Sequence, residues 1–139
     1  MTDFSHFDAP FATFLGIKLT HVSAERVEAE LTVRKELATI PDILHGGAIM
    51  ALADNLGGVA TVANLPKGAR TATIESKTNF FAAIPVGETA RAECTALHRG
   101  RTTMVWQTKI TRRDGRLAAL VIQTQIVIPA EKSGTASPT

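Results

Sequence analysis

Residues 44–66 read LHGGAIMALADNLGGVATVANLP, and this stretch decides the fold. From Gly46 to Pro66 it holds one ionisable side chain, Asp54, and no proline before the last position. Such a long run of small and aliphatic residues predicts a buried helix over about residues 46–63. Asp54, two asparagines, four glycines and the strand-like segments that follow argue against a membrane span.

Strand-like segments surround this helix in the sequence. Downstream, alternating and apolar runs predict four strands, at about residues 71–82, 88–98, 102–113 and 116–128. Asp114-Gly115 is the strongest hairpin signal, and the last run is apolar on both faces, as a central strand would be. Upstream we expect a short helix with Asp8 as N-cap and Gly16 at its end, then a hairpin and a loop, over residues 8–16, 17–33 and 34–44.

This order of elements predicts an α+β fold in which an antiparallel sheet of about six strands covers one long helix. The length of 139 residues fits a single domain, which we place at residues 1–130. Residues 131–139 are rich in Ser, Thr, Gly and Pro and are predicted to be a disordered tail. Exposed strand edges and helical glycines favour self-association.

Composition excludes several classes of function. The net charge is +2, and the basic clusters at 98–101 and 112–113 are too small for a nucleic-acid groove but sufficient for one phosphorylated ligand. A lone cysteine, Cys94, and an N-terminus unlike a signal peptide predict a cytoplasmic protein. The four histidines are scattered, so we expect neither a metal site nor a cofactor.

Two features of the long helix can carry chemistry. His45-Gly46-Gly47 leaves first-turn amides uncovered at the positive end of the helix, where they suit an oxygen that gains negative charge. Alternatively, His45 is only a cap and the glycines only permit close packing. Asp54 is costly to bury unless it serves as base or nucleophile, or bonds to neighbouring amides as a structural carboxylate.

The spacing of these features suggests a shared site. His45 and Asp54 are nine residues apart, which in one helix means opposite faces and a separation of roughly 13 Å. Two antiparallel helices from two subunits would bring Asp54 of one chain to His45 and Gly46 of the other. We therefore hypothesise a composite site and an obligatory dimer.

The segments 44–47 (LHGG) and 51–54 (ALAD) together resemble the motif of the phenylacetate-pathway (PaaI-like) branch of hotdog-fold thioesterases. The resemblance covers about residues 10–128. Four later runs also fit the strand pattern of that branch: Thr73-Ile74-Glu75, Asn79-Phe80-Phe81, Gly100-Arg101 and Asp114-Gly115-Arg116-Leu117. It implies a hotdog fold, a homodimer or a homotetramer of two dimers, and hydrolysis of an acyl-coenzyme A substrate, with an aromatic or medium-chain acyl group expected.

The resemblance also implies catalytic roles. Asp54 would activate water or attack the thioester directly, the Gly46 amide would bind the thioester oxygen, and His45 would help position that carbonyl. Thr73, on the first strand after the helix, matches the position that holds the water in some relatives.

Substrate-binding roles follow in the same way. Relatives often carry Asn or Gln six residues before the motif histidine, where it touches the substrate carbonyl, and this chain has Thr39 there. Either Thr39 fills that role with its shorter side chain or the site works without such a contact. Gly47 would contribute to the substrate socket and Phe81 to the acyl pocket, unless Phe81 packs into core or interface. Arg99 and Arg101 would meet the coenzyme A phosphates, or form only a solvated basic turn.

Two rival functions remain open. A hydratase or dehydratase of the same fold would place its histidine among proline-rich loops, which His45-Gly46-Gly47 does not match. A non-catalytic acyl-coenzyme A sensor would usually carry an added DNA-binding segment, and the His45, Gly46 and Asp54 set favours an enzyme.

Overall fold

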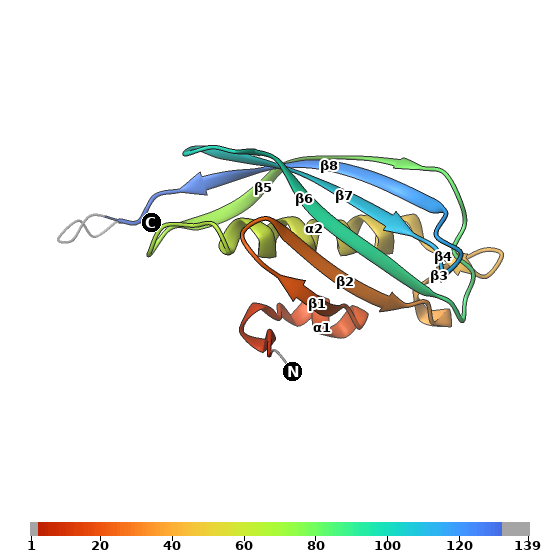
Figure 1. Ribbon diagram of the computed structural model, residues 1–139. Coiled ribbons are helices and arrows are strands. Elements are labelled where there is room, and N and C mark those ends of the chain that lie inside the picture. The colour runs from red at the N-terminus through yellow and green to blue at the C-terminus, as the bar shows by residue number, and fades with distance from the viewer. Residues whose placement is uncertain (1–2, 132–139) are drawn as a thin grey trace.

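The computed structural model describes residues 3–131 and shows one long helix, α2 (Gly46–Val62), lying against a six-stranded antiparallel sheet (Figure 1). The strand order is β1-β2-β6-β7-β8-β5. The strands are β1 (Lys18–Val22), β2 (Arg26–Thr32), β5 (Arg70–Phe80), β6 (Thr89–Arg99), β7 (Thr103–Thr111) and β8 (Leu117–Ile128). The expected α+β hotdog architecture is confirmed, with strand ends shifted by at most two residues from most of the predicted bounds.

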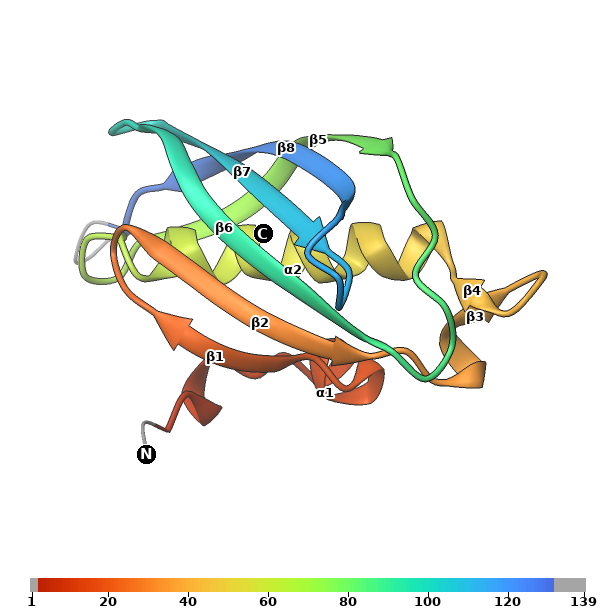
Figure 2. The ribbon, with the colours of Figure 1, turned by 45° about the vertical axis from the view of Figure 1, so that its right-hand side comes forward.

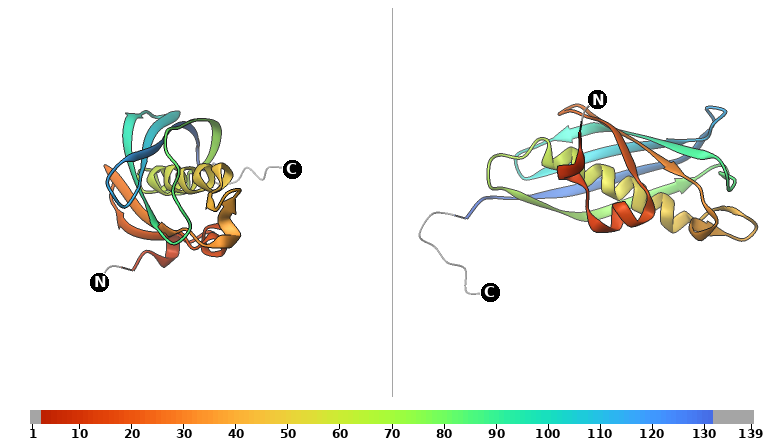
Figure 3. Two further views of the ribbon diagram at one scale, coloured as in Figure 1. Left: turned by 90° about the vertical axis from the view of Figure 1, so that its right-hand side faces the viewer. Right: turned by 90° about the horizontal axis from the view of Figure 1, so that it is seen from below.

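The sheet curls around α2 but leaves one side of the helix uncovered, between β5 and the N-terminal helix α1 (Pro10–Leu15) (Figures 2 and 3). Leu52, Leu56 and Ala60 face the sheet and are fully buried, while Met50 and Asp54 are exposed. The expectation of a wholly buried helix is therefore wrong, because a single sheet can cover only one face of it. Asp54 lies on the uncovered face.

Strand β5 forms one edge of the sheet and pairs only with β8. Their register shifts between Thr73 and Glu75, so that Thr73 lies opposite Gln125 whereas Ser76 lies opposite Gln123. Because side chains alternate along a strand, this bulge keeps Thr73 on the helix side and turns Glu75 to the other face. Strand β8 lies between β7 and β5, which confirms its predicted interior position.

The N-terminal segments depart from expectation in detail. Helix α1 begins at Pro10 with Ala9, not Asp8, as its N-cap, while Gly16 ends it with φ 85° as expected. The hairpin of β1 and β2 is confirmed. Residues 34–44 are not a plain loop, because they form a 3-10 turn (Lys35–Leu37) and a small hairpin of β3 (Ala38–Thr39) and β4 (Ile43–Leu44).

No helix within residues 3–131 is both long and apolar enough to cross a membrane. The predicted disordered tail falls, apart from Glu131, outside the described residues.

Candidate active site

The start of α2 presents one free backbone amide. His45 is the N-cap, and its Nδ1 accepts a hydrogen bond of 2.8 Å from the Gly47 N–H. The Gly47 amide is therefore already used, whereas the Gly46 N–H has no acceptor within residues 3–131. Since Nδ1 is an acceptor, the proton of the neutral ring sits on Nε2. This end of the helix thus offers two donors, the Gly46 N–H and the His45 Nε2–H.

Gly46 lines a cavity of about 390 Å³ together with predicted substrate-binding residues, which we call the Gly46 cavity. Its walls include Thr39, Ile49, Phe80 and Phe81. A Cβ at position 46 would meet the Phe80 ring at 3.2 Å, so glycine allows the ring to lie against the helix start. His45 and Gly47 line an adjacent cavity with Phe11 and Leu15 of α1.

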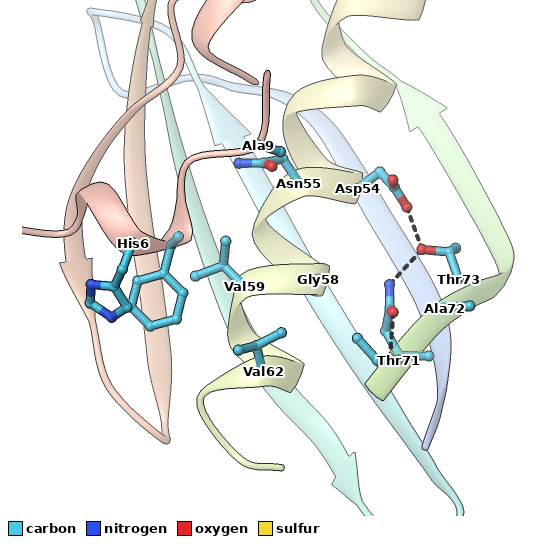
Figure 4. A pocket seen from close by; sticks show the side chains of 12 residues that line it. His6, Ala9, Asp54, Asn55, Gly58, Val59, Val62, Thr71, Ala72 and Thr73 are labelled. Carbon is cyan, nitrogen blue, oxygen red and sulfur yellow. Dashed lines mark hydrogen bonds between the residues drawn. The ribbon is translucent and has the colours of Figure 1, made fainter. Parts of the chain in front are cut away.

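Asp54 lies in a second cavity, of about 340 Å³, which we call the Asp54 cavity (Figure 4). Its Oδ1 accepts a hydrogen bond of 2.7 Å from the Thr73 hydroxyl, which reaches across from β5. Asn55, Gly58 and Val59 continue the wall along α2. The structure thus brings together the expected catalytic carboxylate, Asp54, and the hydroxyl expected to hold the water, that of Thr73.

These two cavities are separate within one chain. Gly46 and Asp54 are eight residues apart in α2, or about 12 Å along its axis, and the Asp54 cavity contains neither Gly46 nor His45. The placement of His45 and Asp54 on opposite helix faces does not hold, because His45 has extended backbone and lies just outside the helix. Distance along the axis, rather than the helix face, separates the two halves.

The predicted arginines lie at a further cavity, of about 480 Å³, with Asn64 and Gly100. Arg99 Nη1 donates to the Ala24 carbonyl at 3.1 Å and to Asn64 Oδ1 at 3.3 Å. Arg101 is exposed and makes neither a hydrogen bond nor an ion pair within residues 3–131. Arg99 therefore ties the end of β6 to the turn between β1 and β2 and to the residues that follow α2, and Arg101 is the freer cation.

Sequence reasoning missed Gln123 and Gln125, which are buried on β8 behind Asp54. Gln125 Nε2 donates to the Thr73 hydroxyl at 2.6 Å. The available signal was a pair of amides two residues apart, with Thr124 between them, in a strand whose other residues are apolar. Trp106 and Cys94 are sheet residues, as expected; burial raises the pKa of the Cys94 thiol to about 11.

Comparison with known proteins agrees with this architecture. Residues 42–119, more than half of the chain, match the family model described as "Thioesterase superfamily". The chain is 31% identical over 104 residues to 1,4-dihydroxy-2-naphthoyl-CoA hydrolase of Escherichia coli K12, which covers 75% of this chain and 76% of that protein. It is 32% identical over 102 residues to the proofreading thioesterase EntH of Klebsiella pneumoniae, covering 73% and 74% respectively.

A solved structure extends the comparison to three dimensions. A variant of thioesterase PA1618 from Pseudomonas aeruginosa superposes with a TM-score of 0.85 at 25% identity, covering 93% of this chain and 96% of that one. The family match, the relatives and the fold agree with one another. The chain belongs to the thioesterase superfamily and is a thioester hydrolase of the hotdog fold.

Proposed function

We propose that this enzyme hydrolyses an acyl-coenzyme A thioester to the free acid and coenzyme A, at a site shared between two copies of the chain. The observation that carries the proposal is that two reactive groups lie apart on α2. One is the Asp54 carboxylate, which accepts a hydrogen bond from the Thr73 hydroxyl, and the other is the free N–H of Gly46 at the start of the helix. Neither half can act alone on one bond across about 12 Å. A second copy with its helix antiparallel would place its Asp54 beside the Gly46 of the first.

The surface of the chain supports this pairing. Strand β5 has an unpaired edge, and such edges favour association with another strand. Large apolar side chains are exposed along it, including Ile74 at 57% and Phe80 at 52%. The uncovered face of α2 lies next to this strand, so one contact surface would bury both. A dimer, or a tetramer of two dimers, completes the fold on this side.

In the shared site, the thioester carbonyl oxygen binds the Gly46 N–H at the positive end of α2, and His45 Nε2–H donates to the same oxygen. Water attacks the carbonyl carbon and gives its proton to Asp54 of the other copy. The carbon–sulfur bond then breaks, and the coenzyme A thiolate leaves and takes the proton back from Asp54, which regenerates the carboxylate. Direct attack by Asp54 to form a mixed anhydride, which water then hydrolyses, uses the same placement.

The cavities suggest how the rest of the substrate binds. The Gly46 cavity, with Phe81 and Thr39 in its wall, would receive apolar acyl groups next to the reacting carbonyl. Arg101, with Arg99 beside it, offers charge for the phosphates of coenzyme A. The naphthoyl-coenzyme A named for the Escherichia coli relative supports an aromatic acyl group here. The free, buried thiol of Cys94 is consistent with a cytoplasmic location.

The test is thiol release from a panel of phenylacetyl, hydroxybenzoyl, short, medium and long acyl-coenzyme A thioesters. We expect wild type to release thiol, and Asp54→Asn to lose about 10³-fold or more in turnover. Because Asn has nearly the same shape as Asp and can still accept the hydrogen bond from Thr73, the variant should keep its fold and oligomeric state. Near-wild-type turnover by Asp54→Asn would overturn the assignment.

A further inference from the structure

Strand β8 carries two buried amides on the face that meets α2. Gln123 is 0% exposed and Gln125 is 1% exposed, although the neighbouring buried positions on this face are apolar. Burying an amide in an apolar interior is unfavourable unless its polar atoms are hydrogen-bonded. The hydrogen-bond partners of these two amides therefore indicate their structural role.

The two amides form a continuous chain of hydrogen bonds that ends at Asp54. Gln125 Nε2 donates to Gln123 Oε1 at 2.7 Å and to the Thr73 hydroxyl at 2.6 Å. The Thr73 hydroxyl donates to Asp54 Oδ1 at 2.7 Å, the last bond of the chain and visible in Figure 4. Thr71 approaches from β5 with its hydroxyl 2.9 Å from Gln125 Oε1.

The direction of these bonds is fixed by counting protons. The Gln125 amide has two N–H groups, and one goes to Gln123 while the other goes to Thr73. The Thr73 hydroxyl therefore accepts from Gln125, and its single proton is left for Asp54. Asp54 Oδ2 accepts no hydrogen bond within residues 3–131 and is left for water or substrate.

Gln123 bonds to α2 from the side of the sheet. Its Nε2 donates to the carbonyl of Ala53, the residue before Asp54, at 2.8 Å. A Cβ at position 57 would overlap the Gln123 amide, so Gly57 is needed for β8 and α2 to approach this closely. The backbone and the carboxylate of Asp54 are thus both held by one buried unit.

We infer that Gln125, supported by Gln123, is a positioning residue for hydrolysis that orients the Thr73 hydroxyl toward Asp54. The inference rests on the proposed role of Asp54. Gln125 lies in the wall of the Asp54 cavity but is only 1% exposed, so we expect it to act through Thr73 rather than by contact with the substrate. It acts by restricting the Thr73 proton to one direction, so that one carboxylate oxygen is bonded and the other faces the reaction.

The test begins with Gln125→Met, which keeps the shape of the side chain and removes both donors. We expect kcat to fall about 10- to 100-fold with KM changed by less than about threefold, because misplacement affects the reaction more than binding. The matched control is Gln107→Met on β7, since Gln107 makes no side-chain hydrogen bond within residues 3–131. The control should keep wild-type kcat.

A double-mutant cycle separates positioning from general loss of packing. Thr73→Val should lower kcat to a similar extent and Thr73→Ser should restore it. Adding Gln125→Met to Thr73→Val should cause no further loss, because Gln125 acts through the Thr73 hydroxyl. Multiplying effects, or wild-type kcat in Gln125→Met, would overturn the inference.

Two further variants keep the outcome of the test clear. If Gln125→Met does not fold, Gln125→Asn retains a buried amide but is too short to reach Thr73, and the same loss of kcat is expected. Asp54→Asn is measured in parallel. If Asp54→Asn is inactive while both Gln125 variants are normal, only this inference fails; if Asp54→Asn is active, the proposed function fails as well.

Discussion

The two reactive regions of α2 are fixed in different ways. At its start, His45 is held by hydrogen bonds to residues close in sequence, from the Gly47 N–H to its ring and from its own N–H to the Leu37 carbonyl. In its middle, Asp54 is held by Thr73 from β5, with Gln125 of β8 behind it. Each region is therefore already hydrogen-bonded in place within one chain. Assembly of the proposed site requires only that two preformed halves be brought together.

The largest expected effect comes from preventing the association of two chains. Ile74→Lys places a charge at the bulge of the edge strand β5, where it should block pairing with a second copy. We expect the mass in solution to fall to that of one chain, 14.8 kDa, and thioesterase activity to be lost with it. Light scattering and thiol release on the same samples measure both.

A matched control for this change is Leu97→Lys. Leu97 is also an exposed bulge residue, at 55% compared with 57% for Ile74, but it lies in the interior strand β6. It should leave both mass and activity unchanged. An active monomer of Ile74→Lys would show that the two halves do not need a second chain.

A smaller effect tests the helix start. His45→Ala removes the bond to Gly47 and the Nε2–H donor, so we expect kcat to fall about 100- to 1000-fold and stability to fall by about 1 kcal/mol. His45→Asn keeps a good N-cap but cannot place a donor at the same point. His45→Asn should restore stability in thermal unfolding without restoring kcat. Recovery of both would show that His45 acts only as the N-cap of the helix.

The smallest effect concerns Cys94 and the thiol assay. Burial raises its pKa to about 11 from an ordinary value near 9, so the native protein should not react with a thiol reagent at pH 8, whereas the unfolded chain should show one thiol. Folding favours the protonated thiol, so stability should fall as pH rises from about 9 through about 11. Cys94→Ala should lose less stability over that range, and rapid labelling of native protein at pH 8 would contradict the burial.

The contrast between the two regions also explains what the sequence could predict. The run from His45 to Asp54 is local, so it identified the helix, its free amide, the carboxylate and the family. The strand-like runs after the helix predicted all four downstream strands to within two residues, with β5 and β7 each ending two residues early, and the upstream run predicted the hairpin without separate strand ends. Residues 34–44 were read as a loop because two-residue strands are too short to show a period.

The support behind Asp54 was beyond sequence reasoning for a physical reason. Thr73 contacts Gln125 only through the register of β5 on β8, and a bulge after Thr73 sets that register. A bulge leaves no reliable mark in composition, and a shift of one residue would have turned Thr73 away from the helix. The exposure of Asp54 was missed likewise, because the sequence does not state which side of a helix its own sheet leaves open.

The central claim, that one site uses two chains, is tested most directly by mixing inactive variants. Chains with Asp54→Asn and chains with His45→Ala are unfolded together and refolded, so that half of the dimers are mixed. Each mixed dimer then holds one site with both halves intact, and we expect thiol release to recover to about a quarter of the wild-type rate. A mixture no more active than the average of its two parents would show that Asp54 and His45 act within the same chain.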